Sequence, residues 1–342
     1  MAAALDPGDA DTRHLRALLL LLQGRFAEGW AAYEARFDTR QGRADRRGFT
    51  QPVWNGEALA GRTILLHAEQ GLGDTLQFCR YAPAVARCGG RVVLEVQQPL
   101  RRLLARMAGV DQVLAQRDAL PDFELHCALL SLPRIFGTGL ETIPADLPYL
   151  AAPPEALARW RARLPKVERR QPSDGGSGER GGHGAGDRTA ERLRIGLVWA
   201  GNAGHVNDRR RSLPFDALAP LWAVLGVSWH SLQVGSLTAD LAAAPPGLIE
   251  DLGQALDDFA ETAAAVCHLD LVVTAYTAVA HLAGALGKPA FVLLPFAPDW
   301  RWMRARSASP WYPGLRLFRQ DARRSWAPVI EAVAQAVVEF GI

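Results

Sequence analysis

The chain has 342 residues, about two domains by the usual ratio of length to domain number, so it can bury a large core and is not a disulfide-stapled miniprotein. Its composition, 49% hydrophobic and 22% charged, is that of an ordinary globular protein. The 38 basic residues, of which only Lys166 and Lys288 are lysines, are interspersed with 36 acidic ones for a formal net charge of +2, which argues against a nucleic-acid-binding protein.

The first predicted elements are two short helices that meet at Gly24. Leucines recur at helical spacing over residues 15–22, and aromatic residues do so over residues 26–37. The pattern resembles the last unit of a tetratricopeptide-repeat array, but one unit leaves the period of about 34 residues untestable. Because a lone repeat cannot bury both faces, residues 1–59 should dock on the next unit or belong to a longer array.

Residues 60–165 alternate short apolar runs with helical patterns. The predicted helices run from the glycine loop at residues 70–74 to about residue 87, and from residue 100 to 107. The predicted strands are residues 63–67, 91–96, 112–115 and 123–126. This alternation predicts βαβ units and a parallel sheet.

A linker and a second alternation complete the chain. Seven glycines fall within residues 171–187, so residues 166–192 are predicted to be a flexible linker. Strands are predicted in the remaining part, residues 193–342, at 193–199, 227–232, 269–274, 289–294 and 315–318. Helices are predicted from residue 215 and at 259–267, 277–286 and 326–340. Two α/β units on either side of a linker predict a cleft.

The cysteines and the apolar runs indicate the cellular compartment and whether a metal site is expected. No cysteine belongs to a CxxC pair or a Cys/His ligand spacing, so free thiols in a reducing compartment and no metal site are expected. The apolar run at residues 17–22 is too short for a secretory signal peptide and no cleavage pattern follows it. No run approaches the ~20 apolar residues of a membrane span.

The first candidate site is the loop at residues 71–75, between a predicted strand and its helix. Its glycines allow a ligand to approach the backbone closely, and the helix start favours an anion. The spacing does not match the GxGxxG fingerprint, so a nicotinamide or flavin cofactor is not expected. By residue type alone, Asp74 is either the cap of this helix or a general base at the carboxyl end of a strand.

The second candidate site is the start of the predicted helix at residues 277–286, which also follows a strand. Its first residues are small, so a phosphorylated ligand can approach the helix N-terminus. His281 lies one turn into this helix and either faces the ligand or packs in the core.

Two further loops follow strands. Residues 199–202 are followed by a polar run at residues 204–212, whose Arg209, Arg210 and Arg211 either form a solvated surface or neutralise a diphosphate. The aromatic loop at residues 295–302 either packs in the core or walls a base or sugar pocket.

Four stretches together resemble bacterial tetratricopeptide-repeat glycosyltransferases, which are related to the ADP-heptose:lipopolysaccharide heptosyltransferase family and more distantly to O-linked N-acetylglucosamine transferase. They are QGLGDTLQF (70–78), GLVWAGN (196–202), TAVAHLAGALGKP (277–289) and PDWRW (298–302). The resemblance covers about residues 15–340 apart from the linker. It implies an α/β GT-B fold, in which two Rossmann-like domains face a cleft with the acceptor on the N-terminal side and the nucleotide sugar on the C-terminal side, without metal or cofactor.

The resemblance also implies residue roles. Asp74 matches the aspartate proposed to deprotonate the acceptor, with Gly71, Gly73, Gln77, Asp299 and Trp300 as acceptor or pocket-wall residues. Thr277, Ala278 and His281 match the family's donor-phosphate helix. Asn202, Arg211 and Ser212 are also expected at the donor phosphates, because the polar loop that carries them follows a strand. The chain departs from the pattern at Tyr276, where the family has an aspartate, and at Val206, where it commonly has a lysine.

The leading hypothesis is therefore an inverting, metal-independent glycosyltransferase of the hexosyl or heptosyl type. Its donor is a nucleotide sugar, and its acceptor is a glycan, a lipid-linked glycan or a protein. The alternative is a catalytically impaired nucleotide-sugar-binding or protein-interaction module, with a protein partner on the helical hairpin. The expected location is cytoplasmic, and attachment to the periphery of the inner membrane is left open.

Overall fold

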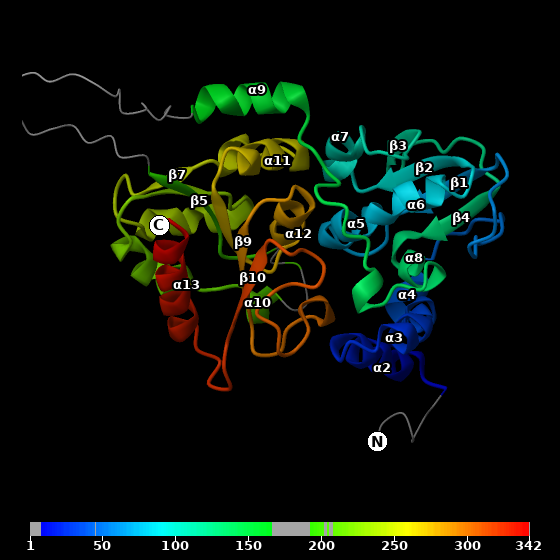
Figure 1. Cartoon of the computed structure of the whole chain (residues 1–342), viewed down its shortest axis with the longest axis horizontal. Helices are drawn as coiled ribbons and strands as arrows, with labels where there is room; N and C mark the ends of the chain where they lie inside the picture. Colours follow the sequence, from blue (N-terminus) through cyan, green and yellow to red (C-terminus); the bar gives the residue numbers. More distant parts are fainter. Residues whose placement is uncertain (1–7, 45, 166–191, 202–203, 205–207, 342) are drawn as a thin grey trace, which may run out of the picture.

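The computed structural model describes residues 8–44, 46–165, 192–201, 204 and 208–341. Within them the chain forms two parallel sheets, one in each half of the sequence (Figure 1). The four-stranded sheet has the order β3-β2-β1-β4, with β1 Thr63–His67, β2 Arg91–Val96, β3 Gln112–Ala115 and β4 Leu125–Ala128. The six-stranded sheet has the order β10-β9-β8-β5-β6-β7, with β5 Leu193–Val198, β6 Val227–Ser231, β7 Ile249–Asp251, β8 Leu271–Ala275, β9 Ala290–Leu294 and β10 Leu315–Arg319.

The helices precede, connect or follow the strands in sequence, and those that connect consecutive strands supply the crossover that a parallel pair needs. In the first half they are α2 Ala10–Leu22, α3 Phe26–Tyr33, α4 Arg40–Ala44, α5 Leu72–Phe78, α6 Ala82–Ala86, α7 Arg101–Leu104, α8 Leu132–Ile135 and α9 Pro154–Arg163. In the second half they are α10 Asp208–Arg211, α11 Phe259–Cys267, α12 Ala278–Ala285 and α13 Ala327–Phe340. Short 3-10 turns, such as η9 Trp300–Trp302, fill several of the loops.

Most predicted strands and the longer helices are present, and the differences have local causes. The predicted helix from the glycine loop to residue 87 is broken by a 3-10 turn at Cys79–Tyr81, ahead of Pro83. The predicted helix from residue 215 is a 3-10 helix that contains Pro220. The strand predicted at 123–126 lies two residues later, and the predicted helix at 100–107 shortens to α7. The predicted linker lies almost entirely outside the described residues.

The N-terminal hairpin is fastened to both halves of the molecule. Gly24, with φ +80°, turns the chain between α2 and α3. Trp30 is buried, and its ring centroid lies 6.2 Å from that of Phe78 in α5 and 5.2 Å from that of Trp300. Its indole N–H donates to the Thr138 carbonyl at 3.0 Å. The hairpin thus buries its aromatic face against the following unit, as the sequence predicts for a single pair of short helices.

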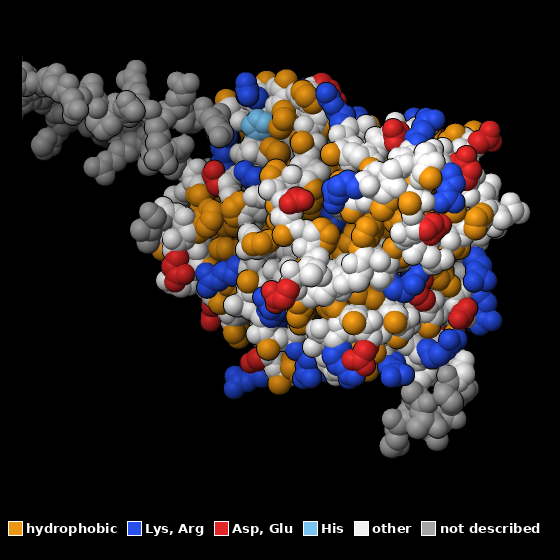
Figure 2. All heavy atoms as spheres, turned by 45° about the vertical axis from the view of Figure 1, so that its right-hand side comes forward, with side chains coloured by type: hydrophobic (Ala, Val, Ile, Leu, Met, Phe, Trp, Pro, Cys, Tyr) orange, Lys and Arg blue, Asp and Glu red, His pale blue; other side chains and the backbone are white. Residues whose placement is uncertain are grey.

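The two halves also contact each other directly. Helices α5 and α12 pack together at the centre of the molecule (Figure 1). The largest apolar cluster includes side chains from both halves. Helix α9, which the sequence analysis missed, packs on α11 of the second half, where Glu261 accepts a hydrogen bond from the Trp160 indole at 2.8 Å. Figure 2 shows acidic and basic side chains interspersed over one face.

Candidate functional site

The candidate loops gather at the carboxyl ends of the strands, where open α/β sheets bind ligands. Asp74 lies in the first turn of α5, just after β1, and its side chain is 18% exposed. The expectation of Asp74 as the N-cap of α5 is wrong, because Gly71 is the N-cap and Asp74 is the third residue of the helix. Its Oδ2 accepts a hydrogen bond from the Gly71 N–H at 2.8 Å, as in a capping box. Its Oδ1 forms an ion pair with the Arg301 guanidinium from the second half. The carboxylate therefore stabilises the start of α5 and also forms an ion pair that connects the two halves.

Gly73 is needed because α12 lies directly against it. A Cβ at this position would stand 2.9 Å from His281 Cδ2 and 3.5 Å from the Ala278 Cα. Any larger residue would thus push α5 away from α12. The turn that carries the candidate base and the start of the candidate phosphate helix are therefore in van der Waals contact.

Of the residues expected on α12, Thr277 caps the helix and His281 lies in the core. The Thr277 hydroxyl accepts a hydrogen bond from the Val279 N–H at 3.2 Å. His281 Nδ1 lies 3.1 Å from the Tyr312 hydroxyl. Burial, reinforced by Arg301 and Arg80, holds the pKa of His281 well below its usual value, so the imidazole is neutral at neutral pH. The packing interpretation fits His281 better than the ligand interpretation.

The polar run after β5 is described in part. A Cβ on Gly201 would collide with the Arg211 guanidinium, and the Ser212 hydroxyl accepts a hydrogen bond from the Gly201 N–H at 3.1 Å. Arg211 Nε donates to Asp208 at 3.1 Å, and its guanidinium lies 5.8 Å from the Tyr276 ring centroid. Asn202 and Val206, and the side chains of Arg209 and Arg210, lie outside the described residues.

Tyr276 takes the place of the family's aspartate at the end of β8. Burial, with a smaller contribution from Asp299, raises the pKa of its phenol above the usual value, so the side chain is neutral at neutral pH. The ring is half-buried and faces the Arg211 guanidinium. This position therefore offers an aromatic face and a hydroxyl in place of a carboxylate.

A pocket of about 220 Å³ opens between α2 and the loop after β9. Most of its lining is apolar, and the Asp299 carboxylate is the charged group among its lining residues. The lining residues are Leu18, Leu19, Leu22, Tyr276, Pro295, Ala297, Pro298, Asp299 and Trp300. Asp299 and Trp300 were expected as wall residues, whereas the contribution of α2 was not foreseen.

Gln77 was also expected at a pocket wall, but its side chain is fully buried. Its Oε1 accepts a hydrogen bond from Arg301 Nε at 2.7 Å. Sequence reasoning missed Arg301, which binds Asp74, Gln77 and Asp299 at once. The sequence did contain one signal: Arg301 stands between two tryptophans in a loop after a strand. Large aromatic neighbours on both sides indicate that the arginine is buried, and a buried arginine needs acidic or polar partners.

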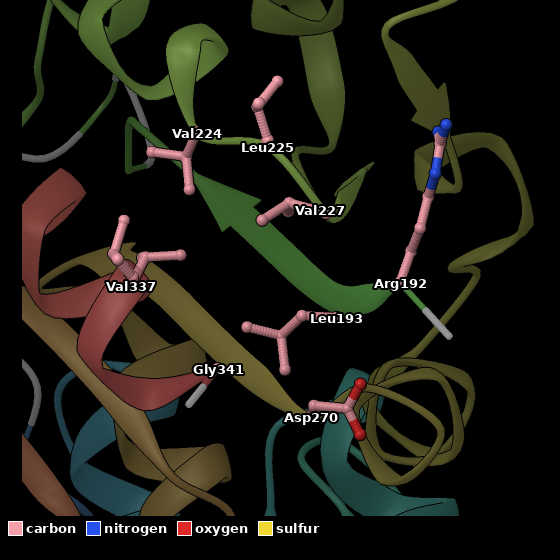
Figure 3. Close-up of a pocket in the computed structure, with 10 residues that line it drawn as sticks. Arg192, Leu193, Val224, Leu225, Val227, Asp270, Val337 and Gly341 are labelled. Carbon is pink, nitrogen blue, oxygen red and sulfur yellow. The ribbon is translucent and has the colours of Figure 1, made fainter. Parts of the chain in front are cut away.

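A larger cavity of about 450 Å³ lies at the opposite, amino-terminal ends of β5 and β6 (Figure 3). It is lined mainly by aliphatic side chains, including Leu193, Val227 and Val337. Its carboxylate, Asp270, accepts a hydrogen bond from the Arg194 backbone N–H at 2.8 Å. The cavity thus lies away from the strand ends that carry the candidate loops.

Neither a metal cluster nor a membrane-spanning helix is found among the residues that the structure describes. They contain no group of three or more His, Cys, Asp or Glu side chains that could hold a metal ion. None of the helices that the structure describes is long and apolar enough to cross a membrane. The four cysteines are free, and Cys79 and Cys127 are buried.

Comparison with curated proteins gives one relative. Protein FlbA of Caulobacter vibrioides (strain ATCC 19089 / CIP 103742 / CB 15) is 29% identical over a 372-residue alignment. The alignment covers 99% of this chain and 57% of FlbA, so the chain spans little more than half of that relative's length. No protein-family model matches the chain.

Comparison with solved structures identifies the fold. The glycosyl transferase family 9 structure from Veillonella parvula DSM 2008 aligns with a TM-score of 0.55 at 11% identity, over 84% of this chain and 99% of that one. Escherichia coli ADP-heptose LPS heptosyltransferase II gives 0.51 at 14%, over 81% and 97%. E. coli heptosyltransferase WaaC with ADP-2-deoxy-2-fluoro heptose gives 0.51 at 13%, over 81% and 99%.

These similarities show that the two-sheet α/β architecture is that of the GT-B heptosyltransferase structures, and they confirm the predicted fold class. At 11–14% identity they show the fold alone. The likeness of the N-terminal hairpin to a tetratricopeptide repeat stays a prediction.

Proposed function

We propose that this protein is an inverting, metal-independent glycosyltransferase. It transfers a sugar of the hexose or heptose type from a nucleotide donor to a hydroxyl group of a glycan, lipid-linked or protein acceptor. The fold likeness supports glycosyl transfer only by analogy, so residue roles have to be argued from the site. Free cysteines, typical of a reducing compartment, support a cytoplasmic location.

The observation that carries the proposal is the contact of α5 with α12. It places the Asp74 carboxylate, at the end of β1, beside the start of the helix that follows β8 of the other sheet. A reaction between an acceptor and a donor bound on different halves needs a base and a phosphate site facing each other at this boundary. Gly73 makes the approach possible, because its missing Cβ leaves room for Ala278 and His281.

In the proposed reaction, the acceptor oxygen attacks the anomeric carbon while the bond from that carbon to the diphosphate oxygen breaks. The acceptor proton passes to Asp74, and the electron pair leaves with the nucleoside diphosphate. The negative charge of the leaving group is stabilised by Arg211 and by the N-terminus of α12. A positioned base contributes typically about 10²–10⁴-fold, and preorganised donors to the developing charge contribute a comparable factor.

The donor pocket is proposed at the carboxyl ends of β8 and β9. Tyr276 presents its ring there, and Asp299 and Trp300 line the 220 Å³ pocket beside it. Aromatic and apolar walls with few polar groups are typical of small-molecule sites. Tyr276 supplies no charge, and the lysine expected at position 206 is a valine, so Arg211 is the described cation proposed to face the diphosphate.

A thermal-shift titration with ADP-, GDP- and UDP-sugars tests the proposal. A ligand at 100 times its dissociation constant stabilises the native state by about 2.7 kcal/mol. We expect one nucleotide series to raise the melting temperature and Arg211→Gln to weaken that series. Arg316→Gln, at an exposed arginine on β10, is the control and should bind as the wild type does. No stabilisation by any nucleotide sugar would contradict the proposal.

A second function is favoured by one observation. Both oxygens of Asp74 already accept hydrogen bonds, one from the Gly71 N–H and one from Arg301, as in a purely structural carboxylate. A nucleotide-sugar-binding module without transferase activity would have this arrangement. Its function would then be to bind a protein partner through the hairpin. Binding of a nucleotide sugar without transfer or hydrolysis would select this function.

A further inference from the structure

Arg301 is the most constrained charged side chain near the candidate base. It lies in η9 and is 7% exposed, and each of its guanidinium nitrogens has a hydrogen-bonding partner. Its Nε donates to Gln77 Oε1 at 2.7 Å, its Nη1 donates to Asp299 Oδ1 at 2.9 Å, and its Nη2 pairs with Asp74 Oδ1. The guanidinium carbon stands 4.2 Å from the Trp300 ring centroid.

We propose that Arg301 is the positioning residue for the Asp74 carboxylate and couples it to the wall of the donor pocket. This inference rests on the proposed function. Arg301 touches neither sugar nor phosphate in it, and acts only through Asp74. Nothing in the motif comparison assigned a role to this arginine.

The geometry of α5 explains why an arginine is required. Asp74 and Gln77 lie three residues apart, so both side chains project from one face of the helix. The planar guanidinium has donors on several edges and binds both acceptors while it stacks on Trp300. A lysine ammonium is a single point charge on a flexible stem and cannot hold both acceptors in this plane.

The carboxylate is fixed at both of its oxygens. Oδ2 is held by the Gly71 N–H within the same turn, and Oδ1 by Arg301 from the other half of the molecule. Two anchors define the plane of the carboxylate and its direction, while each oxygen keeps a second lone pair for the acceptor proton. Since catalytic groups must be held within a fraction of an ångström of the reacting geometry, the second anchor matters for rate.

The same loop reaches the donor pocket. Asp299 and Trp300 line the pocket, and the next residue, Arg301, holds the base. The desolvation cost of burying the guanidinium charge is offset by ion pairs with two carboxylates, Asp74 from the first half and Asp299 from the second. A donor that orders the pocket wall therefore also orders the anchor of Asp74, which links donor occupancy to the position of the base.

Arg80 is a matched control. Like Arg301 it is a buried arginine that bonds across the two halves, but it belongs to the first half: it donates to the Trp311 carbonyl at 3.1 Å and to the Tyr149 hydroxyl at 3.1 Å. Its other described hydrogen bonds go to the Gln77 and Pro144 carbonyls, so none of them involves Asp74. Arg80→Lys therefore loosens the contact between the halves without removing the anchor of the base.

The test compares Arg301→Lys with Arg80→Lys in the full chain, by steady-state release of nucleoside diphosphate from the nucleotide sugar that stabilises the wild type. We expect Arg301→Lys to lower kcat at least tenfold with the donor KM within threefold of wild type. Arg80→Lys should lower the melting temperature similarly but keep kcat. Equal loss of kcat in both variants, or wild-type kcat in Arg301→Lys, would overturn the inference.

Two further variants keep the test decisive if Arg301→Lys does not fold. Gln77→Met removes one acceptor of the guanidinium at similar volume, and we expect a smaller drop in kcat, again without a change in KM; an unchanged kcat counts against the inference. A thermal double-mutant cycle of Asp74→Asn and Gln77→Met, the two acceptors on α5 that Arg301 binds, needs neither substrate nor folded Arg301→Lys. If the losses in melting temperature are additive, the two side chains are not coupled through Arg301 and the inference is refuted. Failure of every nucleotide sugar to bind would instead refute the proposed function.

Discussion

At the residue scale, the contact between α5 and α12 leaves little room for change. Asp74 completes the capping box of α5 and is half of an ion pair, and His281 is buried, neutral and bonded to Tyr312. Residue type alone left two roles open for Asp74 and two for His281. The structure supports the packing role of His281, while for Asp74 the capping-box role and a base role occupy the same carboxylate.

Gly73→Ala tests this tight contact. The added Cβ would stand 2.9 Å from His281 Cδ2, so we expect a loss of about 1–3 kcal/mol in the free energy of unfolding, measured by urea denaturation. Gly48→Ala is the control, because a Cβ there meets nothing within 4 Å and its φ is not positive. Equal stability of the two variants would show that α5 and α12 are not in contact in solution.

At the element scale, the hairpin of α2 and α3 depends on packing. Helices of 13 and 8 residues are marginal by themselves in water, so the aromatic face of α3 supplies most of their stability. Helix α2 also carries Leu15 and Leu19, which are 60% and 57% exposed, and Leu19 lines the 220 Å³ pocket. The hairpin thus bridges the halves and also carries exposed apolar side chains.

Trp30→Ala tests the bridge. It removes the ring contacts with Phe78 and Trp300 and the hydrogen bond to the Thr138 carbonyl. We expect a loss of about 3–5 kcal/mol in unfolding free energy, together with proteolytic cleavage near Gly24 under native conditions. Leu15→Ala, at an exposed site of α2, should change stability by less than about 0.5 kcal/mol. A wild-type unfolding curve for Trp30→Ala would contradict the bridging role.

At the scale of the whole molecule, local periodicity predicted the parallel sheets well. The strands at 63–67, 91–96 and 112–115 have the predicted bounds, because each is a short β-branched run between turn residues. Helix α9 and strand β7 were missed. Helix α9 is strongly polar, with its burial centred on Ala156 and Trp160, and β7 has three residues, too few for a periodic signal.

The candidate site was predictable only in part. The motif-bearing loops were found, because each follows a strand. Arg301 was not found, because its partner Asp74 lies 227 residues away in sequence and the ion pair exists only when the two halves meet. The same holds for α2 at the pocket wall, since no pattern within the helix says which surface it will cover.

Because some histidines are buried in the neutral form, we expect the free energy of unfolding to depend on pH. Burial, with His126 and Arg47 adding to it, lowers the pKa of His67 to about 3 from the ordinary 6.5. The unfolded chain therefore binds more protons between these values, so stability is full above about pH 6.5 and falls as the pH drops towards about 3. One such group contributes a slope of about 1.4 kcal/mol per pH unit in this range.

Urea unfolding at pH 7, 6 and 5 measures this slope. In His67→Leu we expect the slope below pH 6.5 to fall by the contribution of one proton, while His281 continues to act in the same direction. An unchanged slope in His67→Leu would show that His67 is protonated in the folded protein.

In the proposed reaction Asp74 removes the acceptor proton while the donor is bound on the other half. The most direct measurement is nucleoside diphosphate release by Asp74→Asn in a single turnover, with donor affinity from calorimetry and thermal unfolding measured to establish that the variant is folded. We expect release slower by about 10²-fold or more with unchanged donor affinity. Release at the wild-type rate by the folded, donor-bound variant would contradict it.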